Sequence, residues 1–148
     1  MNNLTQKEII LLNDQKSHEE LCVKKYTNYA NQAQDPVLKE MFKKHAQHEQ
    51  QHLNTINQIL SGQVPTMGQQ QSQQQSTSQT GVSNQQDIDL CYDLLATEKY
   101  ISSTYDTAIF EFNDPNIRTA LNHIQKEEQQ HGEEIYKYLK SKGAYNVQ

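Results

Sequence analysis

The stretch Glu49-Gln50-Gln51-His52 occurs a second time in the chain, as Glu128-Gln129-Gln130-His131. Residues i and i+3 of a helix project from the same face, so each stretch directs one carboxylate and one imidazole to the same side. Both stretches interrupt an otherwise apolar pattern with alternating steps of three and four residues, which is typical of the buried side of a helix in a bundle. Charged groups in such a position need a partner.

The same spacing predicts the buried sides of four helices. The second helix should bury Leu38, Phe42, His45, Glu49, His52, Ile56 and Ile59. The fourth should bury Ile117, Leu121, Ile124, Glu128, His131, Ile135 and Tyr138. In the first helix the corresponding residues are Leu12, Gln15, Glu19, Cys22, Tyr26, Tyr29 and Ala33, and in the third they are Cys91, Leu94, Glu98, Ile101, Tyr105, Ala108 and Phe112.

Turn and cap signals join these helices into two hairpins. Asp35-Pro36 and Asp114-Pro115 each provide a helix N-cap followed by proline at the first helical position, so the connections are short and the joined helices antiparallel. We expect hairpins over residues 5–60 and 87–142, with the third helix beginning after Asp87.

The two hairpins are repeats of each other. A shift of 79 residues superposes Asp35-Pro36 on Asp114-Pro115 and the first Glu-Gln-Gln-His stretch on the second, with 11 identities over the 49 positions from 12 to 60. Repeated helical hairpins predict an all-α four-helix bundle with pseudo-twofold symmetry. Residues 61–86 contain ten glutamines in 26 positions and predict a long crossover linker, and residues 143–148 a short tail. The whole chain, 1–148, is thus interpreted as a single domain.

Composition argues against several kinds of partner. The formal net charge is −5 without a basic run, which disfavours nucleic acid and anionic membrane surfaces. No apolar stretch approaches the ~20 residues of a membrane span, and we expect no signal peptide. Cys22 and Cys91 form no CxxC pair and are interpreted as reduced core residues.

The charged positions of the four helices should meet at one depth. Glu19 precedes Asp35 by 16 residues and Glu49 follows it by 14, so both lie roughly 20–25 Å from the turn. The repeat places Glu98 and Glu128 equivalently about Asp114. Four carboxylates in a core are costly unless two divalent cations cancel their charge, and the carboxylates with two imidazoles suit iron or manganese. The alternative is a polar layer held by its own hydrogen bonds, without metal. The proposed ligand set is Glu19, Glu49, His52, Glu98, Glu128 and His131.

This pattern resembles the ferritin-like superfamily, on the rubrerythrin and manganese-catalase side. A narrower resemblance covers roughly residues 87–146, from Asp93-Leu-Leu-Ala-Thr-Glu-Lys-Tyr100 to Lys142-Gly-Ala-Tyr145, and is similar to the coat F domain of endospore-forming bacteria. Ala144 departs from that family's ending, where a bulkier aromatic is expected. The coat F resemblance implies synthesis in the mother-cell cytoplasm, followed by incorporation into the spore coat beside other coat proteins.

The ferritin-like resemblance implies a role for each ligand. Glu49 and Glu128 would bridge two metal ions, Glu19 and Glu98 would be terminal ligands, and each histidine would bind one ion. By the same analogy Tyr26 and Tyr105 would donate hydrogen bonds that orient carboxylates, or else be ordinary core aromatics. Among the other histidines, His45 is interpreted as a packed core residue, and His18, His48 and His123 as surface residues.

Three functions follow from the two resemblances. The first is a spore coat component whose bundle is structural or recruits neighbours, including further copies of itself. The second is a redox enzyme that consumes peroxide, and the third, iron storage, is the least favoured. Peroxide disproportionation would need no electron donor, whereas peroxidase turnover without CxxC pairs would need a separate partner.

Overall fold

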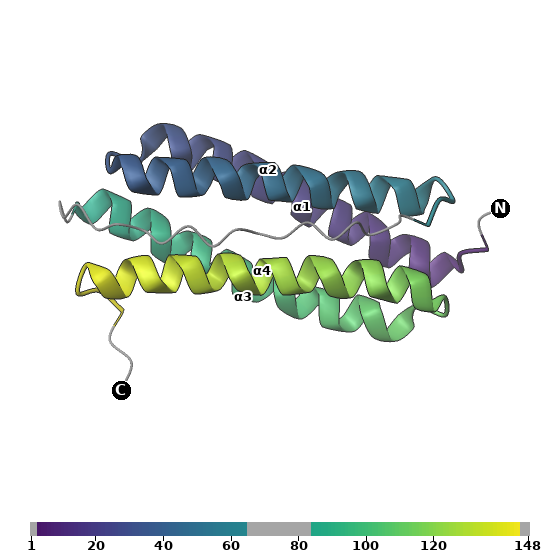
Figure 1. Cartoon of the computed structure of the whole chain (residues 1–148). Helices are drawn as coiled ribbons and strands as arrows, with labels where there is room; N and C mark the ends of the chain where they lie inside the picture. Colours follow the sequence, from purple (N-terminus) through teal and green to yellow (C-terminus); the bar gives the residue numbers. More distant parts are fainter. Residues whose placement is uncertain (1–2, 65–83, 146–148) are drawn as a thin grey trace.

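The protein is a bundle of four helices without strands in the part of the chain that the structure describes, which in this computed structural model is residues 3–64 and 84–145. The helices are α1 (Gln6–Gln32), α2 (Pro36–Leu60), α3 (Gln85–Glu111) and α4 (Pro115–Ser141). The predicted all-α four-helix bundle is therefore confirmed, as are the two hairpins α1–α2 and α3–α4 (Figure 1).

Side-chain caps start three of the helices, two of them at the predicted Asp-Pro turns. Thr5 and Glu8 form a capping box at α1, in which each side chain accepts a hydrogen bond from the other residue's backbone N–H. Asp35 and Asp114 cap α2 and α4 through their side chains, each followed by proline at the first helical position. These caps satisfy backbone donors that have no partner within the helix.

Helix α3 begins three residues earlier than the sequence predicts. Asn84, not Asp87, is its N-cap and accepts hydrogen bonds from the backbone N–H groups of Gln86 and Asp87. The Asp87 carboxylate is instead buried and accepts from the backbone N–H groups of Gln34 and Asp35, in the turn between α1 and α2. The predicted start was wrong because Asp87 already lies inside the helix, and its side chain has its partners in the other hairpin.

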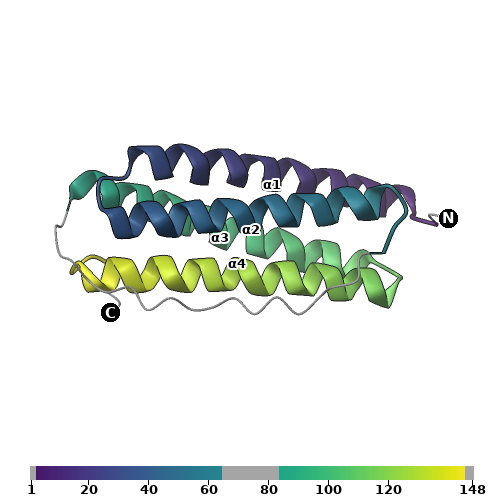
Figure 2. The same ribbon diagram turned by 45° about the horizontal axis from the view of Figure 1, so that its top comes forward.

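The contacts at the helix ends establish the helix directions. The start of α3 lies against the turn that ends α1, and Glu8 at the start of α1 accepts a hydrogen bond from the Asn113 N–H at the end of α3. Helix α3 is thus antiparallel to α1 and parallel to α2, and the end of α2 and the start of α3 lie at opposite ends of the bundle (Figures 1 and 2). Residues 65–83, which make up most of the predicted linker 61–86, lie outside the described residues, as do 146–148 of the predicted tail.

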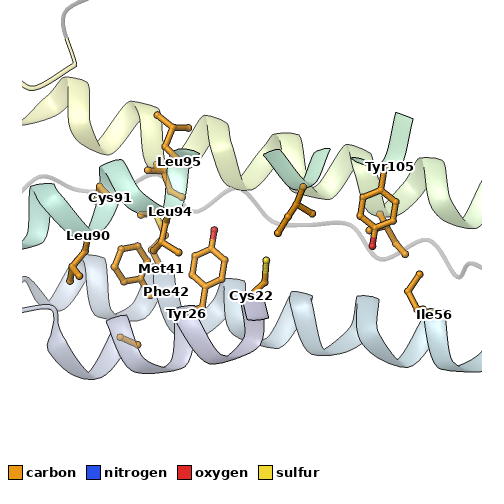
Figure 3. Packing of buried hydrophobic residues seen from close by; sticks show 14 of the residues in the cluster. Cys22, Tyr26, Met41, Phe42, Ile56, Leu90, Cys91, Leu94, Leu95 and Tyr105 are labelled. Carbon is orange, nitrogen blue, oxygen red and sulfur yellow. The ribbon is translucent and has the colours of Figure 1, made fainter. Parts of the chain in front are cut away.

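The predicted buried sides form the core. Of the 28 positions predicted, all are buried except Tyr29, which is half-buried and donates a hydrogen bond to Asp93. Cys22 and Cys91 are buried free thiols, as expected. Figure 3 shows apolar side chains of both hairpins meeting between the helices. Among the described residues, no helix is both long and apolar enough to cross a bilayer.

Candidate metal centre

The six predicted ligands meet in one buried layer near the middle of the bundle. Each of the four helices contributes one glutamate to it, and α2 and α4 each add a histidine one turn further along. None of the six side chains belongs to a residue more than 2 % exposed to solvent. The structure thus brings together at one depth the residues Glu19, Glu49, His52, Glu98, Glu128 and His131.

The atoms that face each other in this layer have no hydrogen-bond partner in the described part of the chain. Glu49 and Glu128 leave both carboxylate oxygens unpartnered, whereas Glu19 and Glu98 each leave only Oε2. On the histidines the unpartnered atom is Nδ1 in both cases. Eight buried donor or acceptor atoms without a partner are unusual in a core, because each costs about 1–3 kcal/mol when desolvated.

The unpartnered atoms form two overlapping groups of metal-ligand size. One ligand atom from each of Glu19, Glu49, His52 and Glu128 lies within 4.8 Å of the others. In this group His52 Nδ1 is 2.7 Å from Glu128 Oε1, 2.9 Å from Glu49 Oε1 and 3.6 Å from Glu19 Oε2. Glu49 and Glu128 also belong to the second group, so these two carboxylates lie between two possible ion positions.

The second group differs from the predicted one. Its members within 4.8 Å are Glu49, Glu98, Glu128 and the thiol of Cys22, whereas His131 Nδ1 lies 3.6 Å from Glu49 Oε1 and 3.7 Å from Glu98 Oε2. The sequence reasoning missed Cys22 because it treated the residue as apolar core. The signal was available in its position, one turn after Glu19 on the same face of α1.

Two tyrosines orient the terminal carboxylates across the hairpin boundary. The Tyr26 hydroxyl donates a hydrogen bond to Glu98 Oε1 over 3.1 Å, and the Tyr105 hydroxyl donates one to Glu19 Oε1 over 2.6 Å. Figure 3 shows the two hydroxyls pointing in opposite directions, each away from its own helix. Burial, followed by the nearby carboxylates, raises the pKa of both phenols, so both stay protonated as donors. The predicted hydrogen-bonding role of these tyrosines agrees with this geometry.

The outward-facing nitrogen of each ligand histidine has a different kind of partner. His52 Nε2 lies 2.7 Å from Glu127 Oε1, whereas His131 Nε2 lies 3.0 Å from Nδ1 of His48. Positions 48 and 127 are equivalent under the 79-residue repeat, directly before Glu49 and Glu128. Such a partner determines which ring nitrogen carries the proton and therefore directs the other towards the layer. The expectation that His48 is a surface residue was wrong, because its ring is half-buried and stacks on that of His131.

His45 completes a cluster of imidazoles around His131. It is fully buried, its ring centroid lies 4.1 Å from that of His131, and its Nε2 lies 2.5 Å from Glu134 Oε2. It belongs to neither group of ligand atoms, in agreement with its interpretation as a packed core histidine. His123 and His18 are half-buried rather than on the open surface, His123 near Glu127 and His18 against Tyr100.

In the metal-free protein, burial and mutual repulsion favour the protonated form of several carboxyl groups in the layer, compared with the same groups in solvent. Burial, followed by the charges of Glu19 and Glu98, raises the pKa of Glu49 to about 7. Burial and neighbouring carboxylates also raise the pKa of Glu98 and of Glu128 well above the usual range. Burial would lower the pKa of His52, but its contacts with four glutamates raise it instead. A set of carboxylates and imidazoles that cannot all be charged at once fits two divalent ions such as iron or manganese.

Comparison with known proteins points to one family. Residues 86–148 match the family model described as "Coat F domain". The chain is also 34 % identical over 82 residues to "Uncharacterized protein YusN" of Bacillus subtilis (strain 168), an alignment that spans 53 % of this chain and 74 % of the relative. No solved structure matches the chain.

Proposed function

Because the chain belongs to the coat F domain family, we propose that it is a spore coat protein whose bundle holds two divalent ions, iron or manganese. The proposal that the bundle binds metal rests on the eight unpartnered atoms that face one another in the central layer. Bound ions would supply the positive charge that this layer lacks and a Lewis-acidic or redox-active centre. The family supports the coat part of the proposal.

The number of oxygens without a hydrogen bond on each glutamate suggests how many ions it would bind. Glu49 and Glu128 have two free oxygens each and lie in both ligand groups, so they would bridge the two ions. Glu19 and Glu98 have one oxygen held by a tyrosine and one free, so each would bind a single ion.

The biological setting follows from the family and the charge. We place synthesis in the mother-cell cytoplasm and the final location in the spore coat, with other coat proteins and a second copy of the chain as partners. The net charge of −5 gives no attraction for nucleic acid or anionic membranes.

A second candidate is a di-metal enzyme that converts two molecules of hydrogen peroxide into two of water and one of oxygen. The observation that favours it is a solvent-accessible cavity between α3 and α4 whose wall includes Glu98 and Glu128, through which a small oxidant could approach. Oxygen release from peroxide by the metal-loaded protein, absent from a double Glu49→Gln/Glu128→Gln variant, would support this function. No release above that of free ions would exclude it.

Metal binding is tested by comparing metal-free and metal-loaded protein. Ions bind the folded layer and not the open chain, so Mn(II) or Fe(II) should raise the melting temperature, and more than Mg(II) does. At a hundredfold excess over the dissociation constant one ion contributes about 2.7 kcal/mol to the free energy of unfolding. Metal analysis should give two ions per chain, falling towards one when His52 or His131 is replaced by Ala.

The control for this experiment is His18→Ala, which removes an imidazole that packs edge to face against Tyr100 and lies outside the layer. It should leave the metal content at two. Equal melting of the metal-free and metal-treated protein, with no metal bound after incubation, would contradict the proposal and leave a purely structural bundle.

A further inference from the structure

A cavity of about 570 Å³ lies between α3 and α4 and connects the central layer with the protein surface. Its wall includes the buried ligands Glu98 and Glu128. The same wall includes exposed residues at the surface, among them Lys99, Asp106 and Glu133. The cavity therefore lies between solvent and two glutamates that are otherwise at most 2 % exposed.

We propose that this cavity is the route by which divalent cations enter the central layer. The inference rests on the proposed metal centre and adds a specific path to it, on one side of the bundle only. Three features of the cavity carry it, namely its charge, the unpartnered atoms at its inner wall, and a glycine where the repeat has a leucine.

The charge of the wall favours cations over anions. Asp106 and Glu133 lie at the surface end of the wall, together with Lys99. Their own contacts compensate only part of this charge. Glu133 lies 3.0 Å from Lys137 Nζ, Asp106 accepts a hydrogen bond from the neutral Gln125 amide, and Lys99 Nζ lies 3.0 Å from the Tyr145 hydroxyl. Carboxylates at the mouth of a cleft raise the local concentration of cations and their rate of association.

The atoms that an arriving ion needs lie directly behind the inner wall. Both oxygens of Glu128 and Oε2 of Glu98 have no hydrogen-bond partner in the described part of the chain, although both side chains are at least 98 % buried. An ion that passes the surface carboxylates therefore meets unpaired carboxylates at the end of the path. Divalent cations give up their water more readily when such oxygens replace it.

Gly132 keeps the cavity open one turn after Glu128. Its equivalent in the first hairpin, 79 residues earlier, is Leu53. A methyl group built on Gly132 would meet Leu95 Cδ1 at 3.8 Å, which is ordinary contact, so alanine fits there without strain. A leucine side chain has three more carbons than alanine and would extend into the cavity, whose wall contains both Gly132 and Leu95.

The first test compares two substitutions of Gly132 in the full-length metal-free protein. Co(II) is added and its uptake is followed by the visible absorption that develops when it binds protein ligands. Gly132→Leu should slow uptake severalfold while the final content stays at two ions per chain, whereas Gly132→Ala should bind at the parent rate. Thermal melting of both variants verifies that they are folded.

The second test removes charge without changing shape. The double variant Asp106→Asn/Glu133→Gln should take up Co(II) up to about tenfold more slowly at low ionic strength, and the difference should vanish in high salt because salt screens the attraction. Glu40→Gln is the matched control, since it removes an exposed carboxylate from α2, away from the cavity.

The outcomes separate this inference from the proposed function. Two ions bound at the parent rate by both Gly132→Leu and the charge variant would overturn the route but leave the metal centre intact. No Co(II) bound by any protein, the parent included, would overturn the metal centre itself.

Discussion

Glu49 shows how much of the site can be predicted from single residues. Its position in a Glu-x-x-His stretch on the buried side of a helix was sufficient to predict that it faces the central layer beside His52, because helical spacing alone brings the two together. The same reasoning could not identify Glu127 or His48 as partners of the ligand histidines. Their contacts, at 2.7 and 3.0 Å, cross from one hairpin to the other and depend on how the two hairpins dock.

Replacement of Glu49 by Gln should change how the stability of the metal-free protein depends on pH. The pKa of Glu49 is raised to about 7 in the fold, above its value in the unfolded chain, so its contribution is present at acid pH and lost as pH rises through about 7. From pH 4.5 to 8 the parent should therefore lose stability relative to Glu49→Gln, by up to roughly 3 kcal/mol. Urea unfolding across this range measures the difference.

The same substitution at the exposed Glu40 is the control and should leave the pH dependence of the parent unchanged. In the metal-loaded parent the direction should reverse, because protons compete with the ions for the ligands as pH falls. A metal-free parent whose stability runs parallel to that of Glu49→Gln over the whole range would contradict the raised pKa.

At the scale of the helices, most boundaries could be predicted because their causes are local. The Asp-Pro turns and the Thr5 capping box lie within a few residues of the backbone groups they satisfy. The start of α3 could not be predicted in this way. The Asp87 carboxylate accepts hydrogen bonds from the turn of the other hairpin, and Asn84 is the N-cap of α3. Glu8, the residue equivalent to Asp87 in the repeat, does the same for Asn113. Each hairpin therefore stabilises the turn of the other.

Replacement of Asp87 by Ala should destabilise the fold by about 1–3 kcal/mol. It leaves the buried N–H groups of Gln34 and Asp35 without acceptors, and the cost of an unsatisfied buried donor lies in this range. Asp87→Asn keeps one acceptor oxygen and should fall between the parent and Ala in urea unfolding. Asp89→Ala, two residues further on the exposed side of α3, is the control. If both alanine variants unfold at the same urea concentration, the cross-hairpin cap is unimportant.

The arrangement of the whole molecule could be predicted because the chain repeats itself. Two copies of one hairpin with charged residues at the same depth have a pseudo-twofold packing as their simplest solution, and the observed bundle has it. What the repeat could not predict is where the halves differ. Cys22 faces the ligands where the second hairpin has Ile101, and Gly132 opens a cavity where the first has Leu53.

Incorporation into the spore coat should not depend on the central layer. The ligands are at most 2 % exposed, so coat partners cannot touch them, and glutamine preserves the shape of glutamate. A Glu49→Gln/Glu128→Gln double variant, expressed in sporulating cells, should thus reach the coat in the amount of the parent while binding less metal. Immunoblotting of proteins extracted from purified spores measures this. Loss of the variant from the coat, although the purified protein stays folded, would show that assembly requires the metal centre.

The position of the unpaired carboxylates also bears on which part of the bundle unfolds locally most easily. Helices normally fray from their ends, and backbone amides at the centre of a bundle exchange their hydrogens most slowly. Here the ends are held by carboxylates from the opposite hairpin, through Glu8 and Asp87, while the metal-free centre carries the unsatisfied charge. We therefore expect backbone amides near the centre of the metal-free bundle to exchange faster than those at its ends, and bound ions to slow exchange at the centre.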